Sequence, residues 1–314
     1  MPITKKLYLV LSIILMVVFI LSGCEQNQNR VKGIRERNKL PGEPEIIVEL
    51  RNGEEKKMKF EEYITGVVAG EMKRDWPDNA YAAQAIIART FALQYMDQNN
   101  TNTISGSYEY AQEYKPQNIT EQLREAVKKS RGEVVVYKDD YIKAWFHASA
   151  GGQTTSAKVG LALAEEEPPY IKSVKSPDQA APDDVKNWKA TFSNEEITAA
   201  LAKLGKNIGL LEKVEIVNRD NTGRLIELKF TGNKGNSMVK AADFRNELAP
   251  KKLKSTKISK IEQEGNSYTF TGSGFGHGVG LSQWGAYTMA KQGKSAEEII
   301  IYYFKDIEIV KEYN

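Results

Sequence analysis

The sequence predicts an α+β fold, and three observations support this prediction. Apolar residues recur with helical spacing between residues 60 and 97. Strand-like segments separated by polar turns follow, from about residue 133 to about residue 270. Once an N-terminal targeting segment is set aside, about 270 residues remain, which is enough for one large domain or for two lobes.

The first 24 residues predict a secretion signal. Two lysines precede an apolar run over residues 7–21, which ends in Leu21-Ser22-Gly23-Cys24, and this is the layout of a signal peptide. The ending resembles a bacterial lipobox, which implies removal of residues 1–23 and lipid on Cys24. The alternative is an uncleaved anchor, because the run is only slightly short of the roughly 20 residues of a spanning helix. Either way, we expect the remaining chain at the outer face of the cytoplasmic membrane.

Residues 24–45 predict a tether, because they are polar and charged and then punctuated by Pro and Gly. The domain itself is expected at residues 46–312. Cys24 is the only cysteine, so a hydrophobic core must stabilise this domain without a disulfide. Without Lys5 and Lys6, the 44 basic groups become 42 against 41 acidic groups, a net charge of +1. This near-neutral body argues against a nucleic-acid partner.

A helix is predicted from Phe60, with apolar residues at positions 60, 63, 64, 67 and 68. The next turn of this stripe places Glu71 where a core residue would stand. Burial raises the pKa of a carboxyl group and lets it serve as a general acid near neutral pH. In the alternative interpretation the helix frays here and Glu71 points into water.

A second helix is predicted from the Asp75-Trp76-Pro77 start signal to Asp97. Between Asp78 and Asp97 its only charged residue is Arg89. The other faces are rich in Ala, Ile, Leu and Phe, which predicts a buried helix. A buried guanidinium needs a partner, and Glu71 is a candidate. The alternative is an arginine whose head reaches solvent.

A hairpin with a polar turn at Lys138–Asp140 leads into the segment His147-Ala-Ser149-Ala-Gly-Gly. His147 is one of two histidines in the chain, and a single histidine is more often structural than catalytic. No H-E-x-x-H spacing is present and no cysteine is free to join a zinc site, so we expect no metal and no cofactor.

Residues 190–270 predict a scaffold. A helix is expected after a capping box of Ser193 and Glu196. A hairpin is expected from Val214 to Phe230, followed by a short helix ending at Leu248 and by further strands.

Glycine occupies every second position from Gly272 to Gly280, in the run G-S-G-F-G-H-G-V-G. The run predicts a strand with one bare face, on which another backbone or a flat ligand could lie. His277, the second histidine, lies within it. A helix capped by Ser282 and closed by Gly293 follows, so we expect a site at this junction.

Three segments in this order resemble the stage II sporulation protein D (SpoIID/LytB) family. They are V-V-A-G-E-M with W-P and A-Q-A-I-I-A-R-T-F-A-L, then A-W-F-H-A-S-A-G-G-Q-T, then G-F-G-H-G-V-G-L-S-Q-W-G-A. The resemblance extends from about Ile46 to Ile309 and includes A-D-F-R-N-E-L at Ala242–Leu248.

The resemblance implies two lobes around a glycan-binding cleft and a peptidoglycan lytic transglycosylase. Such an enzyme cuts MurNAc-GlcNAc bonds in strands without stem peptides and leaves anhydro-muramyl ends, during engulfment of the forespore. Glu71 is then the catalytic acid, Arg89 holds Glu71 or a sugar substituent, and Phe275 or Trp284 stacks on a sugar. Further substrate-binding or supporting residues are expected at His147, Ser149, Gly276, His277, Gly278 and Gln283.

Two alternatives remain open at this point. The LytB side of the family name implies a non-catalytic protein that binds glycan for an amidase. A muramidase that uses water is the third possibility. Expected partners are the glycan strands, a cell-wall amidase, a membrane scaffold of the engulfment machinery and, through the lipid on Cys24, the membrane.

Overall fold

Helices and small sheets alternate along the chain in the computed structural model, which describes residues 34–107 and 111–314. The fold is mixed α+β, as predicted. The chain divides into the units Met1–Arg35 and Glu36–Asn314; β1 (Arg35–Glu36) lies at their boundary and the other elements belong to the second unit. The signal segment and Cys24 lie outside the described residues. Within the described part, no helix is both long and apolar enough to cross a bilayer.

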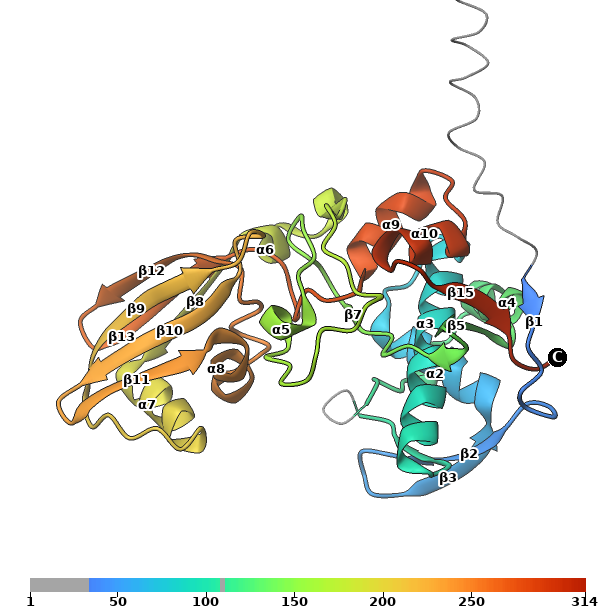
Figure 1. Ribbon diagram of the computed structural model, residues 1–314, viewed down its shortest axis with the longest axis horizontal. Coiled ribbons are helices and arrows are strands. Elements are labelled where there is room, and N and C mark those ends of the chain that lie inside the picture. The colour runs from blue at the N-terminus through green and yellow to red at the C-terminus, as the bar shows by residue number, and fades with distance from the viewer. Residues whose placement is uncertain (1–33, 108–110) are drawn as a thin grey trace, which may run out of the picture. The chain divides into compact units, whose positions relative to one another are not determined.

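The first hydrophobic core surrounds the two helices expected from the sequence, α2 (Phe60–Glu71) and α3 (Asp78–Asn99). Alanines on several faces of α3 allow close approach of its neighbours, and α3 packs against α2 and three further helices (Figure 1). These three are α4 (Glu121–Lys129), α9 (Gln283–Lys291) and α10 (Ala296–Tyr303). Because α9 and α10 come from the end of the chain, this core joins the two ends of the second unit.

Two small sheets border this core. In one, β2 (Glu45–Glu49) pairs antiparallel with β3 (Glu55–Lys59) and parallel with β4 (Thr103–Ser105). In the other, β5 (Glu133–Tyr137) pairs antiparallel with both β6 (Asp140–Tyr141) and β15 (Glu308–Lys311). The β5–β6 hairpin confirms the predicted turn, in which Lys138 and Asp139 have positive φ.

The last part of the expected tether contacts the folded unit. The backbone N–H of Arg37 donates to the carbonyl of Lys311 at 2.8 Å. The Glu43 carboxylate pairs with Arg131 at 2.6 Å and accepts the backbone N–H of Glu61 at 2.9 Å. These contacts hold residues 37 and 43 against the body that begins with β2.

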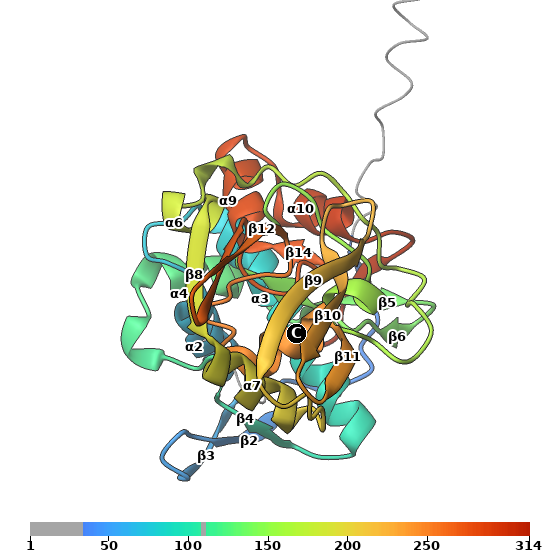
Figure 2. The same ribbon diagram turned by 90° about the vertical axis from the view of Figure 1, so that its left-hand side faces the viewer.

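A second hydrophobic core lies in the segment that the sequence assigns to a scaffold. The capping box of Ser193 and Glu196 is present at the start of α7 (Asn194–Lys203). The predicted hairpin is also present, as β9 (Leu211–Arg219) and β10 (Leu225–Gly232), with β11 (Gly235–Lys240) beside β10 (Figure 2). α8 (Ala241–Leu248) ends where expected. A second sheet has the order β12 (Ile258–Glu264), β13 (Ser267–Gly272), β8 (Trp188–Ser193).

The glycine run differs from the strand that the sequence predicts. β13 ends at Gly272, and Gly274, Gly276, Gly278 and Gly280 have φ values from +71° to +102°. Strand residues need negative φ, whereas glycine adopts positive φ without a steric penalty. The run is therefore an irregular loop with a left-handed glycine at every second position. The expected bare strand and its flat face were wrong.

Short elements connect the two cores and bring distant motifs together. β14 (Leu281–Ser282) pairs in parallel with β7 (Phe146–His147), so that Ser282 lies opposite His147. α5 (Ala157–Gly160), α6 (Asp183–Lys186) and the 3₁₀ turn η2 (Asp178–Ala180) complete the connections, whereas the 3₁₀ turn η1 (Pro116–Asn118) packs against α2. The two histidine segments thus lie side by side, directly before α9.

Candidate active site

Glu71 is the last residue of α2, and its carboxyl group is enclosed although the residue keeps some exposed surface. The backbone N–H of Glu113 donates to Oε1 at 2.8 Å, and Gln283 of α9 donates a second hydrogen bond. Burial is the largest influence on the carboxyl group, and it raises the pKa of Glu71 to about 7. The hydrogen bonds and Lys115 oppose this rise, whereas the charge of Glu113 adds to it. Of the two expectations for Glu71, a buried carboxyl group or one that points into water, the structure shows the buried one.

A carboxyl group with a pKa near 7 is partly protonated at neutral pH and can donate a proton to a leaving oxygen. It can then accept a proton in a later step, because the ionised form is also accessible. Glu71 therefore has the electrostatic properties of an acid that acts also as a base.

Glu113 is a neighbour of Glu71 that sequence reasoning missed. Its side chain is 9% exposed, pairs with Arg51 at 2.6 Å and contacts Lys115 at 3.1 Å. The approach of this loop to α2 depends on Gly70, since a Cβ there would lie 2.0 Å from the carbonyl oxygen of Glu113. Two helical glycines four positions apart, Gly66 and Gly70, were the available signal for such a close contact.

Arg89 is fully buried, as predicted, and this excludes the solvent-reaching alternative. Its partner is Glu61, with Nε–Oε1 and Nη2–Oε2 distances of 3.0 and 2.9 Å. Nη1 donates to the carbonyl of Glu133 at 2.7 Å. The choice of Glu71 as the partner of Arg89 was therefore wrong. Glu61 and Glu71 are both on α2, ten positions apart. Arg89 pairs with Glu61 because α3 contacts the first turn of α2.

His147 and His277 have ring centroids 5.4 Å apart. The N–H of Val279 donates to Nδ1 of His277 at 3.0 Å, while Nδ1 of His147 lies 3.1 Å from the carbonyl of Val279 and donates to it. Burial is the main cause that lowers both pKa values, that of His147 to about 3 and that of His277 well below its usual value. Both rings are therefore neutral at physiological pH. Nε2 of His147 is buried without a partner among the described groups.

Arg224, which sequence analysis did not single out, is fully buried beside the histidines. Its Nη2 donates to the carbonyl of Ala150 at 2.9 Å. A Cβ on Gly278 would lie 2.3 Å from its guanidinium carbon, and a Cβ on Gly276 would lie 2.7 Å from Cβ of His147. Gly276 and Gly278 thus allow the loop to enclose these two side chains, which is a packing role.

Ser149 donates to a buried carboxylate, Asp178 of η2, at 2.9 Å. Ser176 and Ser282 donate to the other oxygen at 2.6 and 2.8 Å. Asp178 therefore connects the segment after His147 to Ser282, the residue that caps α9. No sequence pattern pointed to this carboxylate, because Asp178 follows Pro177 in a stretch without helical or strand periodicity.

Gln283 and Trp284 begin α9 and extend from the histidine segments to Glu71. Gln283 contacts Glu71, and the backbone N–H of Trp284 donates to the carbonyl of Ala148 at 3.0 Å. The Trp284 ring lies 4.7 Å from that of Trp76, centroid to centroid, and Lys73 places Nζ 5.1 Å from the Trp284 centroid. Trp284 is half-buried and follows Gln283 in the first turn of α9.

The predicted residues form two groups. Glu71, Gln283 and Trp284 lie together at the contact of α2 with α9. The residues of the second group surround Arg224 and Asp178 and hold the start of α9; they are His147, Ser149, Gly276, His277 and Gly278. Arg89 belongs to neither group. In the described part of the chain, no three His, Cys, Asp or Glu side chains are grouped as metal ligands.

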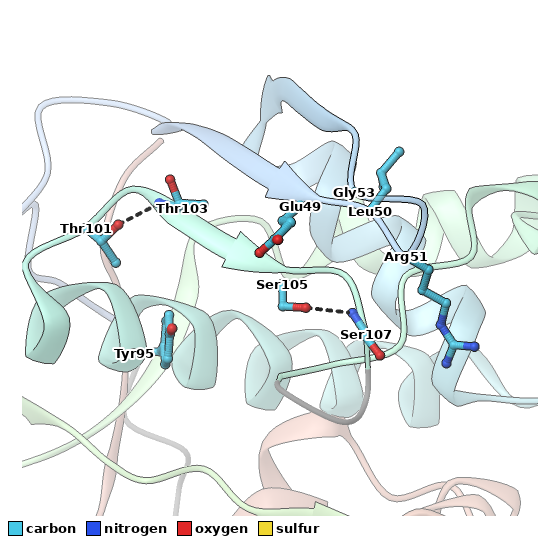
Figure 3. A pocket seen from close by; sticks show the side chains of 9 residues that line it. All are labelled: Glu49, Leu50, Arg51, Gly53, Tyr95, Thr101, Thr103, Ser105 and Ser107. Atoms are coloured by element: carbon cyan, nitrogen blue, oxygen red, sulfur yellow. Dashed lines mark hydrogen bonds between the residues drawn. The ribbon is translucent and has the colours of Figure 1, made fainter.

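A cavity of about 840 Å³ lies against β2 and β4 (Figure 3). Hydroxyl groups from β4 and its flanks line it, with Tyr95 of α3 below and Arg51 at one end. The hydroxyl oxygen of Thr101 accepts a hydrogen bond from the backbone N–H of Thr103 at 3.0 Å, so part of this polar lining already has a hydrogen-bond partner within the protein. None of the residues predicted as site residues line this cavity.

Residues 51–137 match the family described as "Stage II sporulation protein", and residues 140–280 match a domain of unknown function, DUF8618. The chain is 33% identical over 270 residues to stage II sporulation protein D of Bacillus subtilis, covering 80% of this chain and 74% of that protein. It is 32% identical over 261 residues to an uncharacterized protein of Brachyspira hyodysenteriae, covering 82% and 68%. An amidase enhancer of Bacillus subtilis is 25% identical over 288 residues, covering 77% and 39%. The chain belongs to the stage II sporulation protein D family.

Proposed function

We propose that this protein is a lytic transglycosylase of peptidoglycan, with Glu71 as its catalytic acid. The observation that carries the proposal is the enclosed carboxyl group of Glu71, whose pKa is raised to about 7 where α2 meets α9. The substrate would be a glycan strand of alternating MurNAc and GlcNAc residues from which stem peptides have been removed.

The proposed reaction needs one carboxyl group and no water. Glu71 donates its proton to the glycosidic oxygen as the bond from C1 of MurNAc to this oxygen breaks, and GlcNAc leaves with a free hydroxyl group. The C6 hydroxyl of the same MurNAc then bonds to C1 and returns its proton to Glu71. The acid is regenerated and the product is a 1,6-anhydro-muramyl end. A two-carboxylate glycosidase would need a second free carboxylate across the bond.

The neighbours of Glu71 have supporting roles in this proposal. Gln283 orients the carboxyl group through its hydrogen bond. Trp284, with Trp76 beside it, stacks on a sugar ring. His147 and His277 are neutral and support the loop before α9. We place the cleft for the strand between the parts of residues 46–312 built on the two hydrophobic cores.

The family and the N-terminal sequence support a proposal for the cellular setting. We propose that lipid on Cys24 holds the protein at the outer face of the membrane during engulfment, together with a cell-wall amidase that supplies stripped strands and with a membrane scaffold. The alternative setting is a single N-terminal membrane anchor.

A non-catalytic amidase enhancer is the second candidate function, because one relative is named an amidase enhancer. In that role the protein would hold a glycan strand for a separate amidase. Glu71 would then be dispensable for chemistry, and its substitution would affect binding alone.

Mass spectrometry of digested glycan strands tests these proposals. The full chain, the Glu71→Gln variant and a Glu62→Gln control would each be incubated with strands that carry or lack stem peptides. Glu62 is on the same helix but its side chain is 52% exposed. We expect anhydro-muramyl fragments from stripped strands with the wild type and the control, and none with Glu71→Gln. Intact strands that bind to the folded wild type would support the amidase enhancer, and reducing-end products would show a muramidase.

A further inference from the structure

The cavity against β2 and β4 is lined by hydroxyl groups that form one row along the chain. They occupy every second position of β4 and its flanks, at Thr101, Thr103, Ser105 and Ser107 (Figure 3). Side chains at alternate positions of a strand lie on the same face, and Ile104, between them, is buried at 1% exposure. β4 therefore presents its hydroxyl face to the cavity and its apolar face to the first core.

The hydrogen-bonding capacity of this row is only partly used within the protein. The hydroxyl oxygens of Thr101 and Ser105 accept the backbone N–H groups of Thr103 and Ser107 at 3.0 and 3.2 Å. Among the described residues, neither of these two hydroxyls donates a hydrogen bond, and the hydroxyl of Thr103 makes none. A hydroxyl group can donate one hydrogen bond and accept others, so this face can still bind the oxygens of a ligand.

Three further side chains line the cavity and complete its chemistry. Glu49, the last residue of β2, lies opposite Ser105 in the parallel register, and its exposed carboxylate has no ion pair among the described residues. Tyr95 of α3 is half-buried and places an aromatic ring below β4 (Figure 3). Arg51, the cation in the described lining, pairs with Glu113 at 2.6 Å. The cavity thus offers hydrogen-bond donors and acceptors and a ring, but its cation already has a carboxylate partner.

Resting on the function proposed above for the identity of the glycan, we propose that this cavity binds an N-acetylglucosamine unit of the strand. Its volume of about 840 Å³ lies within the roughly 300 to 1,000 Å³ of pockets that hold small molecules. Such pockets are mostly apolar, whereas a row of hydroxyls suits a ligand with many hydroxyl groups, and the Tyr95 ring suits the apolar face of a sugar. The carboxylate of Glu49 disfavours an anion, so the neutral GlcNAc fits better than MurNAc with its free carboxylate.

The position of the cavity relates it to the proposed acid through one residue. The side chain of Glu113 pairs with Arg51 at one end of the cavity, and its backbone N–H donates to Oε1 of Glu71 at 2.8 Å. A strand held by one sugar in the cavity is therefore kept close to Glu71 while another sugar reaches the acid. We expect longer strands to bind more tightly than short ones, because binding of the first sugar raises the effective concentration of the second.

Nitrogen-15 NMR of the full chain tests this inference, with a tetramer of β-1,4-linked GlcNAc as the probe. We expect the backbone amide signals of Thr103 and Ser105 to shift during the titration. A variant with both Thr103→Val and Ser105→Ala should bind the tetramer roughly tenfold more weakly, because two hydrogen bonds to the sugar are lost. The control is Thr191→Val on β8, whose exposed hydroxyl bonds to Thr269 at 2.8 Å, and it should leave the affinity unchanged.

Three results would overturn the inference. The first is a titration in which the signals of β4 do not move, and this result needs no variant. The second is an equal affinity in the double variant and in the Thr191→Val control, with circular dichroism showing that both are folded. The third is a shift of the β4 signals by an isolated stem peptide and not by the GlcNAc tetramer. β4 is at the edge of its sheet, so this last result would assign the edge to a peptide.

Binding and cleavage distinguish this inference from the proposed function. If the tetramer shifts the β4 signals, the double variant binds it more weakly and the wild type releases no fragments from stripped strands, the cavity stands as a glycan site and the transglycosylase proposal fails. If the wild type cleaves stripped strands and the double variant cleaves them with the same KM and binds the tetramer equally well, the transglycosylase proposal stands and the role of the cavity fails.

Discussion

Replacing Glu71 with glutamine should stabilise the protein at alkaline pH and have little effect at acidic pH. The folded pKa of Glu71, about 7, lies above the value of 4.5 for a free glutamate. A group of this kind contributes its full stability below pH 4.5, and that contribution is lost as the pH rises through 7. The wild type therefore has to ionise an enclosed carboxyl group at pH 8.5, whereas the glutamine variant does not.

The size of this effect follows from the two pKa values. A difference of one pKa unit corresponds to about 1.4 kcal/mol, so the span from 4.5 to about 7 corresponds to roughly 3 kcal/mol at pH 8.5. Glutamine has the shape of a protonated glutamate, so the stabilities at pH 4.5 should agree to within about 1 kcal/mol.

Urea unfolding at pH 4.5 and at pH 8.5 measures the unfolding free energy of the variant relative to the wild type at each pH. The effect is the change in this relative stability between the two pH values. From pH 4.5 to pH 8.5, we expect the unfolding free energy of Glu71→Gln to rise relative to that of the wild type. Glu62→Gln, on the exposed side of the same helix, should show no such rise. If the relative stability of Glu71→Gln changed with pH no more than that of Glu62→Gln, the reasoning would be refuted, because Glu71 would then titrate as a solvated carboxyl group. The result would also remove the basis for its role as an acid.

Three further predictions concern the supporting structure. Arg89→Met should cost about 3 to 5 kcal/mol in denaturant unfolding, because it leaves the carboxylate of Glu61, whose side chain is only 13% exposed, without its cation; a loss below about 1 kcal/mol would contradict this ion pair. Gly278→Ala should destabilise by more than Gly205→Ala, since both have positive φ but only Gly278 is packed against Arg224; equal melting temperatures for the two variants would show that packing plays no part. His147, with its folded pKa lowered from 6.5 to about 3, should favour the folded state above pH 6.5 and lose this contribution as the pH falls. We therefore expect His147→Gln to reduce the loss of unfolding free energy between pH 7 and pH 4 by roughly 3 kcal/mol, whereas an unchanged acid profile would contradict this assignment.

Local signals in the sequence predicted most of the elements. The capping box of Ser193 and Glu196, the cap at Ser282 and the apolar stripe before Glu71 each depend on residues within a few positions of one another. Such patterns specify helix ends and buried faces without knowledge of the rest of the chain. For the same reason the buried state of Arg89 could be predicted from its own helix.

Contacts between distant segments could not be predicted in the same way. The partner of Arg89 depends on how α3 lies across α2, and Glu61 and Glu71 carry the same side chain. Glu113, Asp178 and Arg224 became relevant only because loops from elsewhere bring them to the site. The glycine run was misassigned because alternate glycines suit both a bare strand and a loop with alternating positive φ, and the choice depends on what packs against it.

The chain order of the site has a consequence for when activity can arise. Glu71, Glu113 and Lys115 all belong to the first part of the domain, but Gln283 reaches this region from α9, and its neighbour Gln84 is 199 positions away. Contacts over such separations form after local ones, because closing a long loop has an entropic cost. A chain that is synthesised from its N-terminus therefore contains Glu71 long before Gln283 and Trp284 can join it. The protein cannot complete this candidate site until nearly all of its sequence has been synthesised and folded.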